Sequence, residues 1–176
     1  FWNCLIFFKT YQEKNFKPKN AFKPKNLLDK WILSKLHRLN QEIIKWMNSY
    51  ELTKAARLFG DFINEFSNWY IRRSRLRFQK PKNKEEKEEA SQTLYVVLKK
   101  ISVLIAPFLP FISEEIYQNL KGEKEKESVH LLDFPKPDKK LVNKELEKKM
   151  KTIREIVALA LAERAKAGIK VRQPLA

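Results

Sequence analysis

The sequence predicts an all-α fold, an antiparallel helical bundle that ends in a short extended C-terminal appendage. Four long stretches carry apolar residues at spacings of three and four, which is the period of an amphipathic helix. Only three glycines occur in 176 residues, which argues against a β-rich fold with many tight turns. Modest loops join the stretches, and each stretch can bury its apolar stripe only against its neighbours. An antiparallel bundle is therefore the expected packing.

The first element is expected in residues 1–14, where FWNCLIFFK has the character of the tail of an amphipathic helix. It has no leading basic region, starting methionine or small-residue cleavage site, so a signal peptide is not expected. We expect a helix cut out of a longer chain. Residues 15–25 contain Lys17-Pro18 and Lys23-Pro24 without periodicity, which predicts a basic linker.

The second and third elements are long helices. Asn26 is the predicted N-cap of the second, with Asp29 at its third helical position. Its stripe consists of Leu28, Ile32, Leu36, Leu39, Ile43 and Trp46/Met47. The third begins near Glu51 and continues to Trp69 and Tyr70, at least one of which is expected in the core. Gly60 inside it costs about 1 kcal/mol relative to alanine and is expected to allow a close helix crossing.

The remaining elements follow a charged segment. Residues 80–89 mix both signs, so their start is predicted to be a solvated loop. A helix follows up to Ile105, Pro107 and Pro110 break it, and a short helix resumes over 111–120. Residues 128–134 predict either a short strand or an extended connector. The last helix is predicted over 143–167, with Gly168 as its stop.

The formal net charge of +16 points to a polyanionic partner. Nucleic acid is the leading interpretation, an anionic membrane surface comes second, and solubility is the remaining alternative. The longest apolar run, 101–112, is too short and too broken by proline to span a bilayer, so no membrane-spanning role is expected. Cys4 is the only cysteine, so no internal disulfide can form, and we expect a cytosolic protein.

Catalysis by this chain alone is not expected. His37 and His130 lie far apart in sequence and lack the partners of a zinc site or a nucleophilic site. His37 is predicted to be a half-exposed structural histidine. Three isolated glycines cannot build a phosphate-binding loop. We therefore expect no metal or cofactor site in these residues.

The candidate RNA-binding residues are four arginines within six positions, directly after two aromatic residues. They are Arg72, Arg73, Arg75 and Arg77. On a continuous helix at about 100° per residue they fan over about 200°, so they cannot share one narrow face. Some are expected to pair with carboxylates within the bundle and others to point into solvent. Arginine binds phosphate through its forked N–H groups and stacks on unpaired bases.

Five segments, in matching order and spacing, carry a resemblance to a known family. They are LDKWILSKL (28–36), YELTKAARLFGDFINEFSNWYIRRSRLRF (50–78), APFLPFISEEIYQNL (106–120), SVHLLDFP (128–135) and KVRQPL (170–175). The chain resembles the anticodon-binding region of isoleucine–tRNA ligases, which are class I aminoacyl-tRNA synthetases. Valine enzymes share the tryptophan-leucine helix and the proline-broken helix, whereas NWYIRRSR resembles the isoleucine branch more closely.

The resemblance implies a bundle that holds the anticodon stem-loop of isoleucine tRNA. A separate domain of such an enzyme activates isoleucine with ATP and Mg, and its His-x-Gly-His and Lys-Met-Ser-Lys-Ser signatures are absent here. The parent is thus expected to be an enzyme, while this piece lacks the catalytic and editing sites. Residues 1–25 would be the exit helix from the catalytic domain plus the linker, 26–127 the anticodon-binding bundle, and 128–176 the connector, final helix and start of a C-terminal junction.

On this resemblance the expected tRNA-binding residues are Arg72, Arg73, Arg75, Arg77, Lys170 and Arg172. Gln79 stands where many relatives place an aromatic residue, which counts against base stacking beside the arginines. Two alternatives stay open, the equivalent region of a valine or leucine enzyme and a basic helical protein-interaction bundle. The intact enzyme is expected to be a monomer, whereas apolar ends around 1–8 and 169–176 leave self-association of the excised piece open.

Overall fold

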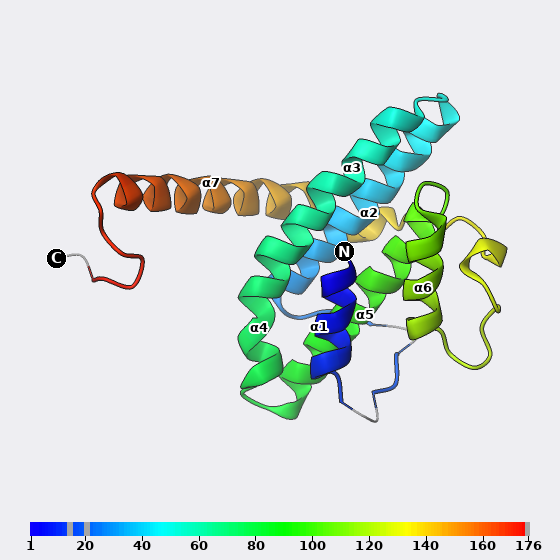
Figure 1. Cartoon of the computed structure of the whole chain (residues 1–176), viewed down its shortest axis with the longest axis horizontal. Coiled ribbons are helices and arrows are strands. Elements are labelled where there is room, and N and C mark those ends of the chain that lie inside the picture. Colours follow the sequence, from blue (N-terminus) through cyan, green and yellow to red (C-terminus); the bar gives the residue numbers. More distant parts are fainter. Residues whose placement is uncertain (14–15, 20–21, 175–176) are drawn as a thin grey trace. The chain divides into compact units, whose positions relative to one another are not determined.

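The computed structural model describes residues 1–13, 16–19 and 22–174, which contain helices and no β-strand (Figure 1). This confirms the all-α class. Asn15, Asn20 and Ala21 of the predicted linker and Leu175 of the KVRQPL segment lie outside the described residues. Contacts divide the chain into one unit of residues 1–142 and another of residues 143–176. The connector predicted over residues 128–134 therefore belongs with the first unit by its contacts.

The first unit is built on two helical pairs. Its helices are α1 (Trp2–Tyr11), α2 (Leu27–Asn48), α3 (Leu52–Glu65), α4 (Arg72–Gln79), α5 (Lys84–Ile105) and α6 (Pro110–Leu120). Helix α2 packs most extensively on α3, and α5 on α6, while α2 and α4 also contact α5. The shared core includes Trp31, Ile32, Leu36, Phe59, Phe62, Leu94, Leu98 and Ile101. The side chain of Asn26 accepts a hydrogen bond from the Leu28 backbone N–H at 2.9 Å, which confirms the predicted cap.

Helices α3 and α4 are joined without a loop by a π-helix over Phe66–Ile71. In a π-helix each N–H bonds the carbonyl five residues back, so each residue turns through less than the angle of an α-helix. Arg72, Arg73, Arg75 and Arg77 follow the π-helix and lie in the α-helix α4, where about 100° per residue applies as assumed. The rings of Phe62, Phe66 and Tyr70 stack in sequence, with centroids 6.1 and 5.8 Å apart. Tyr70 is fully buried and Trp69 is half-buried, as the apolar stripe predicts.

Gly60 lies on an exposed face of α3. A Cβ built at this position meets no atom within 4 Å, so the expected close helix crossing at Gly60 is wrong. The glycine has no packing role in the described structure.

Helix α5 begins at Lys84, where Asn83 caps it by accepting from the Glu86 N–H at 2.8 Å. Only the start of the charged segment is a loop, as predicted, and residues 84–89 are already helical. Pro107 lies in the break after α5, and Pro110 is the first residue of α6, a position that needs no N–H donor. The proline-broken helix and its short continuation are confirmed.

The connector after α6 contains 3₁₀ turns at Val129–Leu131 and Lys139–Leu141, so the strand alternative is wrong. His37 on α2 holds this connector, because its Nδ1 accepts a hydrogen bond from the Asp138 N–H at 2.8 Å. Asn40 Nδ2 donates to the Pro135 carbonyl at 2.8 Å. His37 is consequently buried and not half-exposed, because a segment about a hundred residues away in sequence covers it.

The second unit contains α7 (Lys144–Lys166), which Asn143 caps through the Leu146 N–H at 2.9 Å. Gly168 has φ 66° and ends the helix as predicted. The Gln173 N–H donates to the Lys170 carbonyl at 3.0 Å, so a turn occurs where the sequence predicts an extended appendage. No helix in the described ranges of either unit has the length and apolar character needed to cross a membrane.

Candidate nucleic-acid interface

Helix α4 presents three of the four clustered arginines to solvent. Arg72, Arg73 and Arg75 are exposed, whereas Arg77 is buried with 8% of its surface accessible. Ser74 and Phe78 are buried with Arg77, which shows that this side of α4 faces the bundle. The first turn of α4 is therefore a basic surface of three arginines.

Two of these arginines lie over aromatic rings. The Arg73 guanidinium is 4.5 Å from the centroid of the Trp69 ring, and that of Arg75 is 6.0 Å from the Phe7 ring on α1. An aromatic partner orders a guanidinium while its N–H groups stay available for phosphate. Gln79 stands at the position where the resemblance leads one to expect an aromatic residue. Its Nε2 donates to the Tyr11 hydroxyl at 2.7 Å. Trp69 and Phe7 thus supply the aromatic surface beside the arginines.

Arg77 belongs to a buried network with Asp29 and Tyr70. Its Nη1 and Nη2 donate to the two carboxylate oxygens of Asp29 at 2.7 and 2.8 Å, and the Tyr70 hydroxyl donates to Asp29 Oδ1 at 2.7 Å. Burial raises the pKa of Asp29 above its ordinary value, against the hydrogen bonds from Arg77. Burial also acts to lower the pKa of Arg77, but the bonds and charge of Asp29 raise it overall. The expectation that some arginines pair with carboxylates inside the bundle is confirmed for Arg77.

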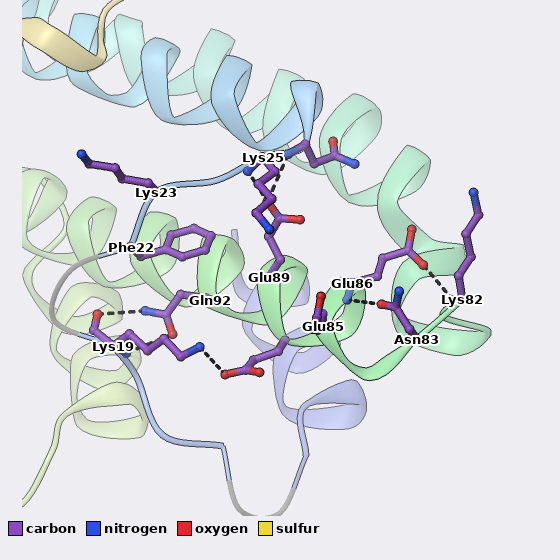
Figure 2. A pocket seen from close by; sticks show the side chains of 12 residues that line it. Lys19, Phe22, Lys23, Lys25, Lys82, Asn83, Glu85, Glu86, Glu89 and Gln92 are labelled. Carbon is purple, nitrogen blue, oxygen red and sulfur yellow. Dashed lines mark hydrogen bonds and ion pairs between the residues drawn. The ribbon is translucent and has the colours of Figure 1, made fainter.

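Glu89 on α5 links this network to the segment before α2. Its Oε2 lies 3.5 Å from Arg77 Nη2, while its Oε1 accepts from the backbone N–H groups of Lys25 and Asn26, the latter at 3.0 Å (Figure 2). We call the described residues 16–19 and 22–25 the basic strap. One carboxylate therefore fixes the end of the strap, the start of α2 and the inner side of α4.

A hollow of about 790 Å³ lies between the basic strap and the first turns of α5 (Figure 2). Its lining includes the four lysines Lys19, Lys23, Lys25 and Lys82 and the four glutamates Glu85, Glu86, Glu88 and Glu89. Lys19 pairs with Glu88 at 2.6 Å, and its backbone N–H and carbonyl both bond the Gln92 amide at 3.1 Å. The four lysines and four glutamates of the lining balance in charge, so the hollow does not attract a polyanion. Its side chains instead hold the basic strap on α5.

Lys170 and Arg172 follow α7 in the second unit and are exposed. The Lys170 carbonyl accepts a hydrogen bond from Arg164 Nη2 at 2.5 Å, which ties the turn back to α7. The Lys170 side chain is left on the surface. No group of three or more His, Cys, Asp or Glu side chains in the described ranges could hold a metal ion.

The family model for the anticodon-binding domain of tRNA ligases matches residues 29–176. The chain belongs to this family. Isoleucine–tRNA ligase of Dehalococcoides mccartyi is 42% identical over 181 residues, which cover 99% of this chain and 18% of the relative. The enzyme of Chlamydia trachomatis is 47% identical over 175 residues (98% and 17%), and that of Clostridium tetani 44% over 180 residues (99% and 17%).

The chain thus spans less than a fifth of the length of the curated relatives it matches. The resemblance to the anticodon-binding region of isoleucine–tRNA ligases is confirmed. The matched relatives are aminoacyl-tRNA synthetases by name, and the match falls on a non-catalytic part of them.

Five of the six predicted tRNA-binding residues of this family member are exposed, and Arg77 is the exception. All six remain predictions as RNA contacts. Sequence reasoning missed the partners of Arg77, namely Asp29, Tyr70 and Glu89. One signal was available, because Asp29 precedes the buried Ile32 and Leu36 by three and seven residues and so lies on their face of α2.

Proposed function

We propose that this chain is the anticodon-binding region of an isoleucine–tRNA ligase and that it binds the anticodon stem-loop of isoleucine tRNA. The observation that carries the proposal is the family match across residues 29–176. The three relatives named above support the isoleucine assignment over the valine and leucine alternatives. The net charge of +16 supplies the long-range attraction that a polyanionic ligand requires.

In this proposal the exposed arginines and the buried one have different tasks. Arg72, Arg73 and Arg75 contact phosphates or unpaired bases, and the aromatic partners of Arg73 and Arg75 orient their guanidinium planes. Arg77 is buried, and its ion pairs with Asp29 and Glu89 fix α4 on α2 and α5. Lys170 and Arg172 add phosphate contacts from the second unit.

The proposal places the chemistry of the intact enzyme outside these residues. Neither catalytic signature occurs in the sequence. ATP and Mg would be bound by the catalytic domain, and this region would contribute tRNA binding alone. Such an enzyme would work as a monomer in the cytoplasm, where it would attach isoleucine to its tRNA.

A salt series with three tRNAs tests the proposal. Roughly six phosphate contacts predict a slope of log affinity against log salt near −4 to −5. Isoleucine, valine and leucine tRNAs should give similar slopes, because the slope counts phosphates, but isoleucine tRNA should bind tightest. Tightest binding of valine or leucine tRNA would replace the isoleucine assignment. Absence of binding at moderate salt would overturn the proposed function.

Exposed apolar residues on α1 favour a second candidate, a protein-interaction bundle. Trp2 and Ile6 both lie on the surface of α1. This candidate predicts little RNA affinity and association through α1. The mass of the parent chain and of a Trp2→Gln variant is measured as a function of protein concentration. The protein-interaction candidate predicts association that Trp2→Gln weakens, whereas RNA binding alone predicts the same mass for both proteins.

A further inference from the structure

The turn between α2 and α3 places an aromatic residue at a position that normally belongs to glycine. The N–H of Glu51 donates to the carbonyl of Trp46 at 2.9 Å, and that of Tyr50 donates to Met47 at 3.0 Å. These two bonds define a Schellman motif at the end of α2, with Tyr50 at its left-handed position. The φ of Tyr50 is 57°, and no other non-glycine residue in the described ranges has a positive φ.

The same motif ends α7 with the usual residue. There the N–H of Ile169 donates to the Arg164 carbonyl at 2.9 Å and that of Gly168 to Ala165 at 3.1 Å, with φ 66° at Gly168. A side chain with a Cβ is sterically disfavoured in this conformation, and glycine is not. Tyr50 therefore makes the turn less stable than glycine would.

Packing does not compensate for this strain. The Tyr50 side chain is 92% exposed, so its ring stabilises nothing in the first unit. In Figure 1 the turn forms the free end of the α2–α3 hairpin. A strained backbone that holds a ring in solvent indicates a functional position.

Cationic side chains surround the ring of the neighbouring Trp46. The ammonium groups of Lys45 and Lys54 each lie 4.9 Å from the centroid of that ring. Lys54 also pairs with Glu51 at 3.0 Å, which fixes it at the start of α3. The end of the hairpin thus combines an exposed tyrosine ring with two positioned cations, which is the composition of surfaces that stack unpaired bases and hold their phosphates.

We propose that the α2–α3 turn is a second RNA contact of this region, at which Tyr50 stacks on an unpaired nucleotide of the tRNA. Lys45 and Lys54 bind the phosphates beside that nucleotide. The inference rests on the proposed function and adds to it a site separate from the arginines of α4. The cations favour a nucleotide over an apolar protein segment as the occupant.

Replacement of Tyr50 by glycine provides the test, because this variant retains the turn and removes only the ring. We expect Tyr50→Gly to unfold at a higher denaturant concentration than the parent chain, because the strain is relieved. We expect its affinity for isoleucine tRNA to fall about tenfold, the loss of one stacked base. Tyr50→Phe keeps the ring and should bind like the parent.

Phe111→Ala is the matched control, because Phe111 is 91% exposed on α6 and lies outside the turn. It should leave tRNA affinity unchanged. Equal tRNA affinity of Tyr50→Gly and the parent chain would overturn the second contact while the proposed function stands. An equal loss in Phe111→Ala would overturn it as well, because exposed rings in general would then be responsible. Absence of tRNA binding by the parent chain would overturn both proposals.

Discussion

Arg77 donates two parallel hydrogen bonds to Asp29 across 48 residues of sequence, and both side chains are buried. The pair joins α4 to the first turn of α2, and Glu89 joins it to α5. The last of the four clustered arginines therefore shapes the surface that the other three occupy. The buried Arg77 thus stabilises the position of α4, whereas the exposed Arg72, Arg73 and Arg75 form the candidate interface.

Removal of Arg77 should be strongly destabilising. Arg77→Ala leaves the Asp29 carboxylate buried without its charged partner, and breaking such a pair costs about 3–5 kcal/mol. Chemical denaturation of the parent and the variant measures this loss. Arg73→Ala is the matched control and should cost at most about 1 kcal/mol, because Arg73 is exposed and loses only its cation–π contact with Trp69. Similar losses for both variants would contradict the division of roles.

The exposed arginines should affect binding and leave stability almost unchanged. Each of Arg72→Gln, Arg73→Gln and Arg75→Gln removes one cation without reversing its charge. We expect each variant to weaken isoleucine tRNA binding and to lower the salt slope by about 1, the signature of one lost phosphate contact. Binding assays across the salt series measure both effects. A variant whose slope equals that of the parent chain would remove its arginine from the interface.

Local features of this fold could be predicted from the sequence. Asn26 caps α2 and Gly168 ends α7 because each acts within one helical turn, where residue type determines the geometry. The prolines that break the helix after Ile105 act in the same local way. The family resemblance likewise depended on contiguous segments.

Features that depend on distant partners could not be predicted. The burial of Arg77 requires Asp29, and the burial of His37 requires the connector around Asp138. The π-helix at Phe66–Ile71 shifts every later residue relative to the helical period assumed from the sequence. Tyr50 was equally hidden, because a Schellman turn without glycine lacks the residue that signals it. The candidate site was thus predicted as a cluster but not in its division into buried and exposed members.

The stability of the fold should depend on the protonation of His37. Burial and the nearby Lys100 ammonium lower the pKa of His37 from 6.5 to about 4, although Asp138 opposes this shift. The unfolded chain binds the proton more tightly, so protonation favours unfolding. Stability from this group is complete above about pH 6.5 and is lost as the pH falls towards 4, by at most about 3 kcal/mol.

His37→Gln provides the comparison for this pH dependence, because glutamine retains a hydrogen-bond acceptor but does not titrate. Unfolding free energies of both proteins are measured between pH 4 and pH 7.5. The parent should lose more stability than the variant as the pH falls. Protonation of carboxylates lowers the unfolding free energy of both proteins equally, so the difference between the curves reports His37. Parallel curves would show that His37 titrates normally in the folded state.

Substitution of Gly60 by alanine should stabilise the protein. Space is open around a Cβ at this position, and alanine is preferred to glycine in a helix by about 1 kcal/mol. A thermal or denaturant unfolding curve detects the gain. Binding of tRNA should not change, since Gly60 has no part in the candidate interface. A loss of stability would reveal a packing role that the structure does not contain.

The central claim is that this region reads the anticodon of isoleucine tRNA, and an anticodon exchange tests it most directly. The affinity of the parent chain is measured at one moderate salt concentration for isoleucine tRNA and for the same tRNA carrying a different anticodon. The phosphate charge is identical in the two ligands, so only recognition of anticodon bases can separate them. We predict at least a tenfold preference for the native anticodon, the difference expected from about 1–3 kcal/mol of discrimination for each base whose edge is read by hydrogen bonds. Equal affinity for the two tRNAs would contradict the account.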